Sequence, residues 1–131
     1  MTRKFALVVG IAFLVAGVLG FIPGITVNHE YLLGIFAVDP VHNLIHLLVG
    51  AFGVAAYYYD RSRLYCQILG VVYLLVGILG FVPPMLVGGE MLFGLFHVNL
   101  ADNLLHLLVG AAAAYLWFAP QFSGRRITPT H

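Results

Sequence analysis

Apolar residues fill four long segments of the chain, and polar residues gather between them. The apolar segments cover residues 5–21, 41–59, 64–82 and 100–118, and none contains a lysine or an arginine. A helix needs about 20 apolar residues to cross the hydrocarbon core of a bilayer, because each residue rises about 1.5 Å. The pattern therefore predicts an all-α, polytopic membrane protein: a single membrane domain over residues 1–131 with four transmembrane helices.

Composition agrees with this prediction and excludes a compact soluble fold. The 131 residues are 62% hydrophobic and only 8% charged, and their mean hydropathy is +1.01. A soluble domain carries roughly 25% charged residues. The lipid bilayer is therefore the expected surrounding of the chain. The single cysteine, Cys66, excludes an internal disulfide and a cysteine-based zinc site.

The positions of the charges predict the orientation in the membrane. If the four helices alternate in direction, every basic residue lies on one side, at Arg3, Lys4, Arg61, Arg63, Arg125 and Arg126. The positive-inside rule then places both termini in the cytoplasm, with residues 120–131 as a cytoplasmic tail. Four of the five acidic residues fall on the outer side. No basic stripe is present that would indicate a nucleic-acid partner.

The second half of the chain repeats the first. Residues 10–51 and 70–111, aligned without a gap, are identical at 21 of 42 positions. The repeat units cover about residues 5–60 and 64–119, and each predicts a helix, an outer connection and a returning helix. Because each unit crosses the membrane twice, both face the same way. We expect two parallel helix hairpins related by a pseudo-two-fold axis along the membrane normal.

The outer connections, residues 23–39 and 83–99, are long for simple turns. Their centres are apolar and begin at Glu30 and Glu90. We predict that each forms a short interfacial or re-entrant helix over the outer mouth of the bundle. Asp39, followed by Pro40, is typical of the start of a helix.

Glycines recur at spacings that place them on helix faces used for packing. Small residues let transmembrane helices approach closely. The predicted packing positions are Gly10, Gly17, Gly20, Gly50, Gly70, Gly77, Gly80 and Gly110. The same stripes also allow a homo-oligomer.

Polar residues on the second and fourth predicted helices fall on one face of each helix. His42, Asn43, His46 and Gly50 lie within about 100° of helix surface. The matching face of the fourth helix carries Asp102, Asn103, His106 and Gly110. Polar residues within a span usually face the interior of the bundle. We therefore expect the two faces to look at each other in the outer leaflet.

Several interpretations of these polar faces are open. In the first, the histidines with Asn43 and Asn103 form hydrogen bonds that pair the helices. In the second, a transition-metal ion binds to histidine and carboxylate ligands, namely His42, His46, His106, Asp102, Glu30 and Glu90. In the third, His46 and His106 are axial ligands of a b-type haem. A proton or ion path through the same residues is a fourth.

The chain resembles a family of small four-helix bacterial membrane proteins that is known only as a domain of unknown function. The resemblance rests on a repeated motif, Asn-Leu-x-His-Leu-x-x-Gly, which occurs at residues 43–50 and 103–110. Gly-x-x-Gly-Phe-x-Pro precedes it at residues 17–23 and 77–83. The resemblance covers roughly residues 5 to 118. It implies a bacterial inner membrane and carries no activity over.

The sequence thus predicts a small multi-pass membrane protein with a polar histidine, asparagine and acid cluster near its outer face. It contains no phosphate-binding glycine loop, no nucleophile elbow and no Ser/His/Asp set. We expect a non-enzymatic structural or accessory component. The alternative is a metal- or haem-binding protein that uses the cluster.

Overall fold

The structure, a computed structural model, describes residues 1–27, 30–88 and 90–118. Four helices make up most of it: α1 (Thr2–Leu19), α2 (Pro40–Tyr58), α3 (Ser62–Leu79) and α4 (Leu100–Phe118). All four are long and apolar enough to cross a membrane. The prediction of four membrane-spanning helices is therefore confirmed at this level, with helix ends that differ from the predicted ones by at most three residues. The fold suits a multi-pass membrane protein.

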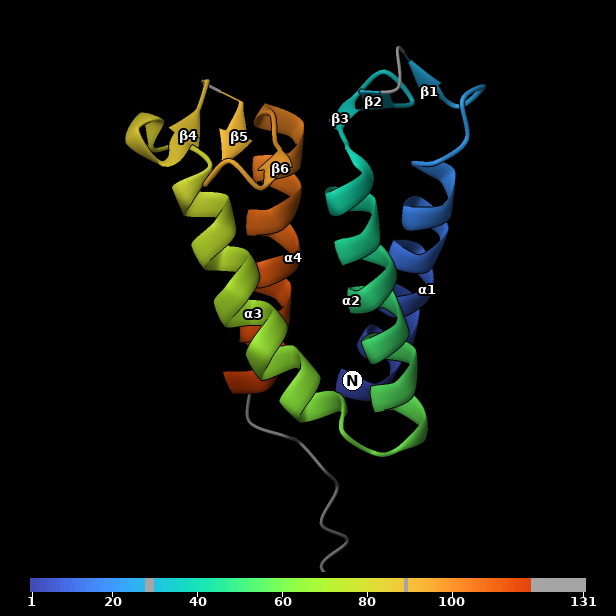
Figure 1. Cartoon of the computed structure of the whole chain (residues 1–131). Coiled ribbons are helices and arrows are strands. Elements are labelled where there is room, and N and C mark those ends of the chain that lie inside the picture. The colour runs from blue at the N-terminus through green and yellow to red at the C-terminus, as the bar shows by residue number, and fades with distance from the viewer. Residues whose placement is uncertain (28–29, 89, 119–131) are drawn as a thin grey trace, which may run out of the picture.

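The helices pack as two hairpins, α1 with α2 and α3 with α4 (Figure 1). Their glycines bring the backbones into contact. A Cβ atom added at Gly10 would lie 2.9 Å from the Gly50 carbonyl oxygen, and one added at Gly70 would lie 2.9 Å from the Ala114 nitrogen. Both distances are too short for a side chain, so glycine is required for this approach. In lipid there is no hydrophobic driving force between helices. Close backbone packing at these glycines therefore stabilises each hairpin.

The two hairpins meet through a small core on α1, α2, α3 and α4. Its buried members are Ala6, Phe13, Ala56, Tyr65, Cys66, Leu69, Tyr73 and Ala113. The rings of Phe13 and Tyr73 pack edge to face, with centroids 5.5 Å apart. The Tyr65 hydroxyl donates to the Val49 carbonyl at 3.0 Å and so joins α3 to α2. The thiol of Cys66 is fully buried in this core.

The outer connections are small sheets, so the prediction of short helices there is wrong. The first holds β1 (Thr26–Val27), β2 (Tyr31–Leu32) and β3 (Phe36–Ala37) in antiparallel order. The second holds β4 (Leu86–Val87), β5 (Met91–Leu92) and β6 (Phe96–His97) in the same order. A short 3-10 helix, η1 (Pro83–Met85), precedes it.

Tight turns explain why these segments are not helical. Leu33 and Gly34 have φ values of 56° and 71°, and the Ile35 N–H donates to the Leu32 carbonyl at 3.0 Å. Two central residues with positive φ and this hydrogen bond define the turn that matches the twist of a β-hairpin. Phe93 and Gly94 have φ values of 53° and 71° in the second sheet. The first central residue of each turn, Leu33 or Phe93, is apolar. An apolar residue at this position is not a turn signal, so the sequence does not predict the turn.

Each sheet packs on the opposite hairpin. Strand β3 contacts α4, and β6 contacts α2. The Asn99 side-chain amide also donates to the Ile35 carbonyl at 2.8 Å. The sheets therefore link the two hairpins at one end, and Figure 1 shows both sheets at the end of the molecule opposite the N-terminus and the α2–α3 turn.

Of the basic residues, Arg3 and Lys4 lie at the start of α1, Arg61 lies in the α2–α3 turn and Arg63 lies at the start of α3. Arg125, Arg126, His131 and the predicted tail over residues 120–131 lie outside the described residues, as does His29.

Candidate metal centre

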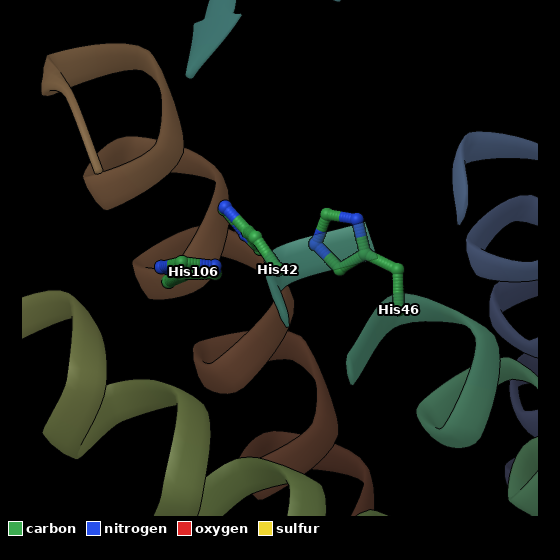
Figure 2. A group of neighbouring side chains, drawn as sticks. All are labelled: His42, His46 and His106. Carbon is green, nitrogen blue, oxygen red and sulfur yellow. The ribbon is translucent and has the colours of Figure 1, made fainter. Parts of the chain in front are cut away.

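Three histidines meet near the end of the helices that carries the two sheets. His42 and His46 come from α2, and His106 comes from α4 (Figure 2). Only 2%, 4% and 3% of their surfaces, respectively, are exposed. One ring nitrogen from each can be chosen so that all three lie within 4.8 Å of one another. Two residues one helical turn apart on α2 thus face a third on α4.

Most of these ring nitrogens lack a hydrogen-bond partner within the described part of the chain. They are Nε2 of His42, Nδ1 and Nε2 of His46, and Nδ1 of His106. A buried polar atom without a partner costs about 1–3 kcal/mol. Among the described residues, these four nitrogens therefore form no hydrogen bonds that pair the helices. Each neutral ring keeps one nitrogen lone pair, and one nitrogen from each ring lies within 4.8 Å of the others, as in a set of metal ligands.

A hydrogen bond to Nδ1 fixes the tautomer of His42. Its Nδ1 lies 2.9 Å from the carbonyl oxygen of His97 in β6. A carbonyl oxygen only accepts, so Nδ1 carries the proton and donates. The other nitrogen, Nε2, then keeps its lone pair when the ring is neutral, and it has no hydrogen-bond partner among the described residues. Histidine ligands of metals are oriented by the same kind of bond from the nitrogen that does not bind the ion.

Asp39 holds this arrangement in place from the start of α2. One carboxylate oxygen accepts from the His42 backbone N–H at 2.7 Å, and the other accepts from the His97 N–H at 2.6 Å. The first bond caps α2, and the second attaches β6 of the other hairpin. The side chain of His97 turns away and pairs with Glu90 at 3.3 Å.

Aromatic rings and a small cavity surround the histidines. Phe13 packs against His46, Tyr73 against His106 and Phe96 against His42, with centroids 5.1, 5.2 and 5.2 Å apart. A cavity of about 180 Å³ lies beside the three rings, and its other walls come from Ile45, Val72, Tyr73, Val76 and Phe96. The three rings thus supply nearly all the polar surface of an apolar pocket.

The spacing of the histidines fits a single metal ion. With Zn–N bonds of about 2.0–2.1 Å, ligand nitrogens in a tetrahedral site are roughly 3.4 Å apart. Nitrogens within 4.8 Å of one another reach that spacing after small rotations of the rings. Neutral imidazoles suit zinc, copper, iron and nickel. A three-histidine set also leaves one coordination position open toward the cavity.

A haem fits the same arrangement poorly. Two axial imidazoles approach opposite faces of the macrocycle, so the space between His46 and His106 would have to hold the porphyrin. Figure 2 shows the His42 ring in that space, and its centroid lies 4.4 Å from that of His46 and 5.9 Å from that of His106. The geometry favours an ion over a haem.

The carboxylates considered as ligands lie apart from the three rings. Asp102 is 1% exposed, and its carboxylate accepts from the Asn99 N–H at 3.1 Å while its own N–H donates to the Asn99 side chain at 3.0 Å. This reciprocal pair caps α4. Glu30 and Glu90 are exposed on the outer sheets. None of the three joins the group of converging nitrogens.

The two asparagines of the motif face the ends of α1 and α3. The Asn103 amide donates to the Gly80 carbonyl at 3.0 Å, at the end of α3. A Cβ atom at Gly20 would overlap the Asn43 side chain, and one at Gly80 would overlap Asn103. Asn103 therefore satisfies a carbonyl that the end of a helix leaves free.

Sequence reasoning missed the roles of Asp39 and His97 in the site. The sequence indicates only that Asp39 caps its own helix. His97 has no counterpart in the first repeat, where the aligned residue is Ala37. His97 contributes through its backbone N–H and carbonyl. Almost every residue type has both groups, so the identity of the residue does not predict this role. The carboxylate of Asp39 was the one visible signal, because a capping carboxylate keeps a second oxygen free for another donor.

The matched family is described as "Domain of unknown function (DUF4383)", and its model matches residues 3–119. The chain belongs to this family. The resemblance inferred from the repeated motif is thus confirmed, and the family brings no activity with it. No curated protein and no solved structure matches the chain. What this DUF4383 member does must be argued from its own site.

Replacing Asp39 by alanine is expected to lower the free energy of unfolding by about 2–4 kcal/mol. The change removes two hydrogen bonds to a charged acceptor, each contributing about 1.5–3 kcal/mol, in part offset by relief of carboxylate burial. Asp39→Asn should cost less, because its single carbonyl oxygen still caps α2. Unfolding by SDS in mixed micelles measures the change.

The exposed Glu30 supplies the control for this prediction. Glu30→Ala removes a carboxylate from the same outer connection and should change stability by less than about 0.5 kcal/mol. Equal effects of Asp39→Ala and Glu30→Ala would contradict the double role of Asp39.

Proposed function

We propose that the protein binds one transition-metal ion in the membrane through His42, His46 and His106. The observation that carries the proposal is the close approach of three buried rings, in which Nε2 of His42, both nitrogens of His46 and Nδ1 of His106 have no hydrogen-bond partner among the described residues. The ion belongs to the class that takes imidazole ligands, with Zn²⁺ as the first candidate and copper as the second. No reaction is assigned to it.

Charge balance supports a divalent ion at this position. A buried cation needs compensating anions, because burial of a lone charge is very unfavourable. Asp39 precedes His42 by three residues, and Asp102 precedes His106 by four, so each carboxylate lies about one helical turn from a ligand. An ionised carboxylate at both positions would balance the charge of one divalent ion. On this proposal Asp102 acts through charge and helix capping and does not coordinate the ion.

The cavity supports a site with an exchangeable position. Three protein ligands and one open position are typical of zinc sites that bind water or a substrate, whereas structural zinc sites use four protein ligands. The cavity of about 180 Å³ beside the rings has room for such a group. A water molecule or a small anion is the expected fourth ligand.

A structural role is the second candidate. It is favoured by the bonds that Asp39 and His97 make between the two hairpins at the outer end. In that case the histidines and the bonds of Asp39 and His97 hold the bundle together, and the protein is a non-enzymatic accessory component. Metal binding distinguishes the two candidates, because a purely structural cluster takes up no ion.

We further propose the orientation and symmetry of the chain in the membrane. Basic residues at the N-terminus and the α2–α3 turn support a cytoplasmic position for that end. The cluster would then face the outside of a bacterial inner membrane. The identity of 21 of 42 aligned positions supports two parallel hairpins related by a pseudo-two-fold axis.

The proposal is tested by titrating purified, chelator-treated protein in mild detergent with Co²⁺. Three imidazoles and one solvent ligand should give the visible absorption of four-coordinate Co²⁺, saturating at one ion per chain. Added Zn²⁺ should displace it. Binding should weaken as the pH falls, because protons compete for the same imidazole nitrogens.

His97→Gln is the control for this titration, because it removes a nearby histidine side chain and keeps the carbonyl that orients His42. It should leave the Co²⁺ spectrum unchanged. The three-histidine site would be refuted if the unmodified protein gave no saturable Co²⁺ spectrum. It would also be refuted if His97→Gln by itself removed that spectrum.

A further inference from the structure

A long apolar groove runs between α2 and α3, at the end of the molecule that carries the α2–α3 turn. Its volume is about 480 Å³. It extends from Tyr59 and Arg61 at the turn to Val49 and Tyr73 deeper in the span. Arg61 is the one charged residue among the described residues that line it. The Tyr65 hydroxyl already donates to the Val49 carbonyl, so the wall there is apolar.

The depth of the groove matches one leaflet of a bilayer. From Arg61 to Tyr73 the chain advances 12 residues, or about 18 Å at about 1.5 Å per residue. Half of a hydrocarbon core of about 30 Å is about 15 Å. An acyl chain that lies along the membrane normal therefore has the length to fill the groove, with its polar end beside Arg61.

The charge at the mouth of the groove selects the polar end. Arg61 is exposed, and the salt bridges recorded for the described residues leave it without a carboxylate partner. Asp60 and Arg61 in the turn, together with Arg63 at the start of α3, have a net charge of +1. A guanidinium group binds phosphate through two parallel hydrogen bonds. Anionic lipid head groups are also attracted to basic residues next to a span.

We propose that this groove is a binding site for one anionic phospholipid. An acyl chain lies between α2 and α3, and the phosphate binds Arg61. The lipid fills a gap that the helices leave between the two hairpins. The mouth of the groove lies at the end of the molecule away from the three histidines, and only its deep end, at Val72 and Tyr73, reaches the histidine cavity. The test counts bound lipid, so its failure is distinct from a failure of metal binding.

Native mass spectrometry of the full chain in mild detergent tests the proposal. The protein is titrated with dioleoylphosphatidylglycerol and, separately, with dioleoylphosphatidylcholine, which has the same acyl chains and no net charge. A single phosphatidylglycerol should be retained per chain. Arg61→Gln should weaken its binding about fivefold, the effect of one basic residue near an anionic lipid, and should leave phosphatidylcholine binding unchanged.

Two matched variants make the test specific. Arg63→Gln removes the same charge from an exposed residue at the start of α3 that does not line the groove, and it should have a smaller effect. Ala55→Trp fills the groove and should displace the lipid. Ala51→Trp, one turn earlier on α2 and outside the groove, should not.

Three results would overturn the proposal. Equal retention of both lipids, unchanged by Ala55→Trp, would mean that the lipid only surrounds the protein. Equal losses in Arg61→Gln and Arg63→Gln would mean that the attraction is general to the turn. Dimers that persist without lipid and dissociate in Ala55→Trp would identify a second copy of the chain as the occupant.

Discussion

Replacing both His46 and His106 by alanine is expected to abolish metal binding. The unmodified protein should bind one ion per chain, whereas a single remaining imidazole, His42, cannot hold an ion against solvent. The loss should also be seen after growth with supplemented metal. Elemental analysis of protein purified in mild detergent measures the metal content, and the Co²⁺ spectrum checks it.

The double variant should remain folded, which keeps the result interpretable. Both ring nitrogens of His46 and Nδ1 of His106 have no hydrogen-bond partner among the described residues. Their loss removes mainly ring packing, against Phe13 and Tyr73. His46→Phe together with His106→Phe keeps a ring at each position and should also bind no metal. Bound metal in either folded double variant would refute the site.

Gly50→Leu is expected to separate α1 from α2 and to destabilise the protein by at least about 3 kcal/mol, the upper end of the usual effect of overpacking. A Cβ atom at Gly50 would lie 2.6 Å from the Leu14 nitrogen and 2.7 Å from the Gly10 carbonyl oxygen. Both are backbone atoms, so no rotamer change relieves the clash. The melting temperature and the elution profile in detergent measure the effect.

Gly24→Leu is the matched control for this prediction. A Cβ atom at Gly24 would meet no atom within 4 Å, and the residue is exposed. Its substitution should change stability by less than about 0.5 kcal/mol. If the two glycine variants melt at the same temperature, the close approach of α1 and α2 at Gly50 is incorrect.

The sequence determined the membrane-spanning helices because their signal is local and strong. Each span is a long apolar run without a basic residue, and in lipid a helix is the simplest way to satisfy the backbone. The spacing of His42 and His46 on one helix face followed from the same periodicity. The choice among pairing, metal and haem stayed open, because spacing along one helix does not show what the opposite helix presents.

The outer connections failed as sequence predictions for a physical reason. Their apolar residues suggested an amphipathic helix, but Gly34 and Gly94 adopt a left-handed conformation that closes a hairpin. The partners that hold each small sheet come from the other hairpin, some 60 residues away, as in the bond from Asn99 to Ile35. No local pattern encodes a contact at that separation.

The sequence by itself thus determined three things: that the chain suits a membrane, which residues form its four helices, and which polar residues share a helix face. The tertiary structure alone decided which of those residues meet. It brought His106 to His42 and His46, left Asp102, Glu30 and Glu90 aside, and placed the His97 carbonyl where it orients the His42 ring. Burial, orphaned lone pairs and backbone contacts between distant segments are properties of packed helices, and these properties define the site.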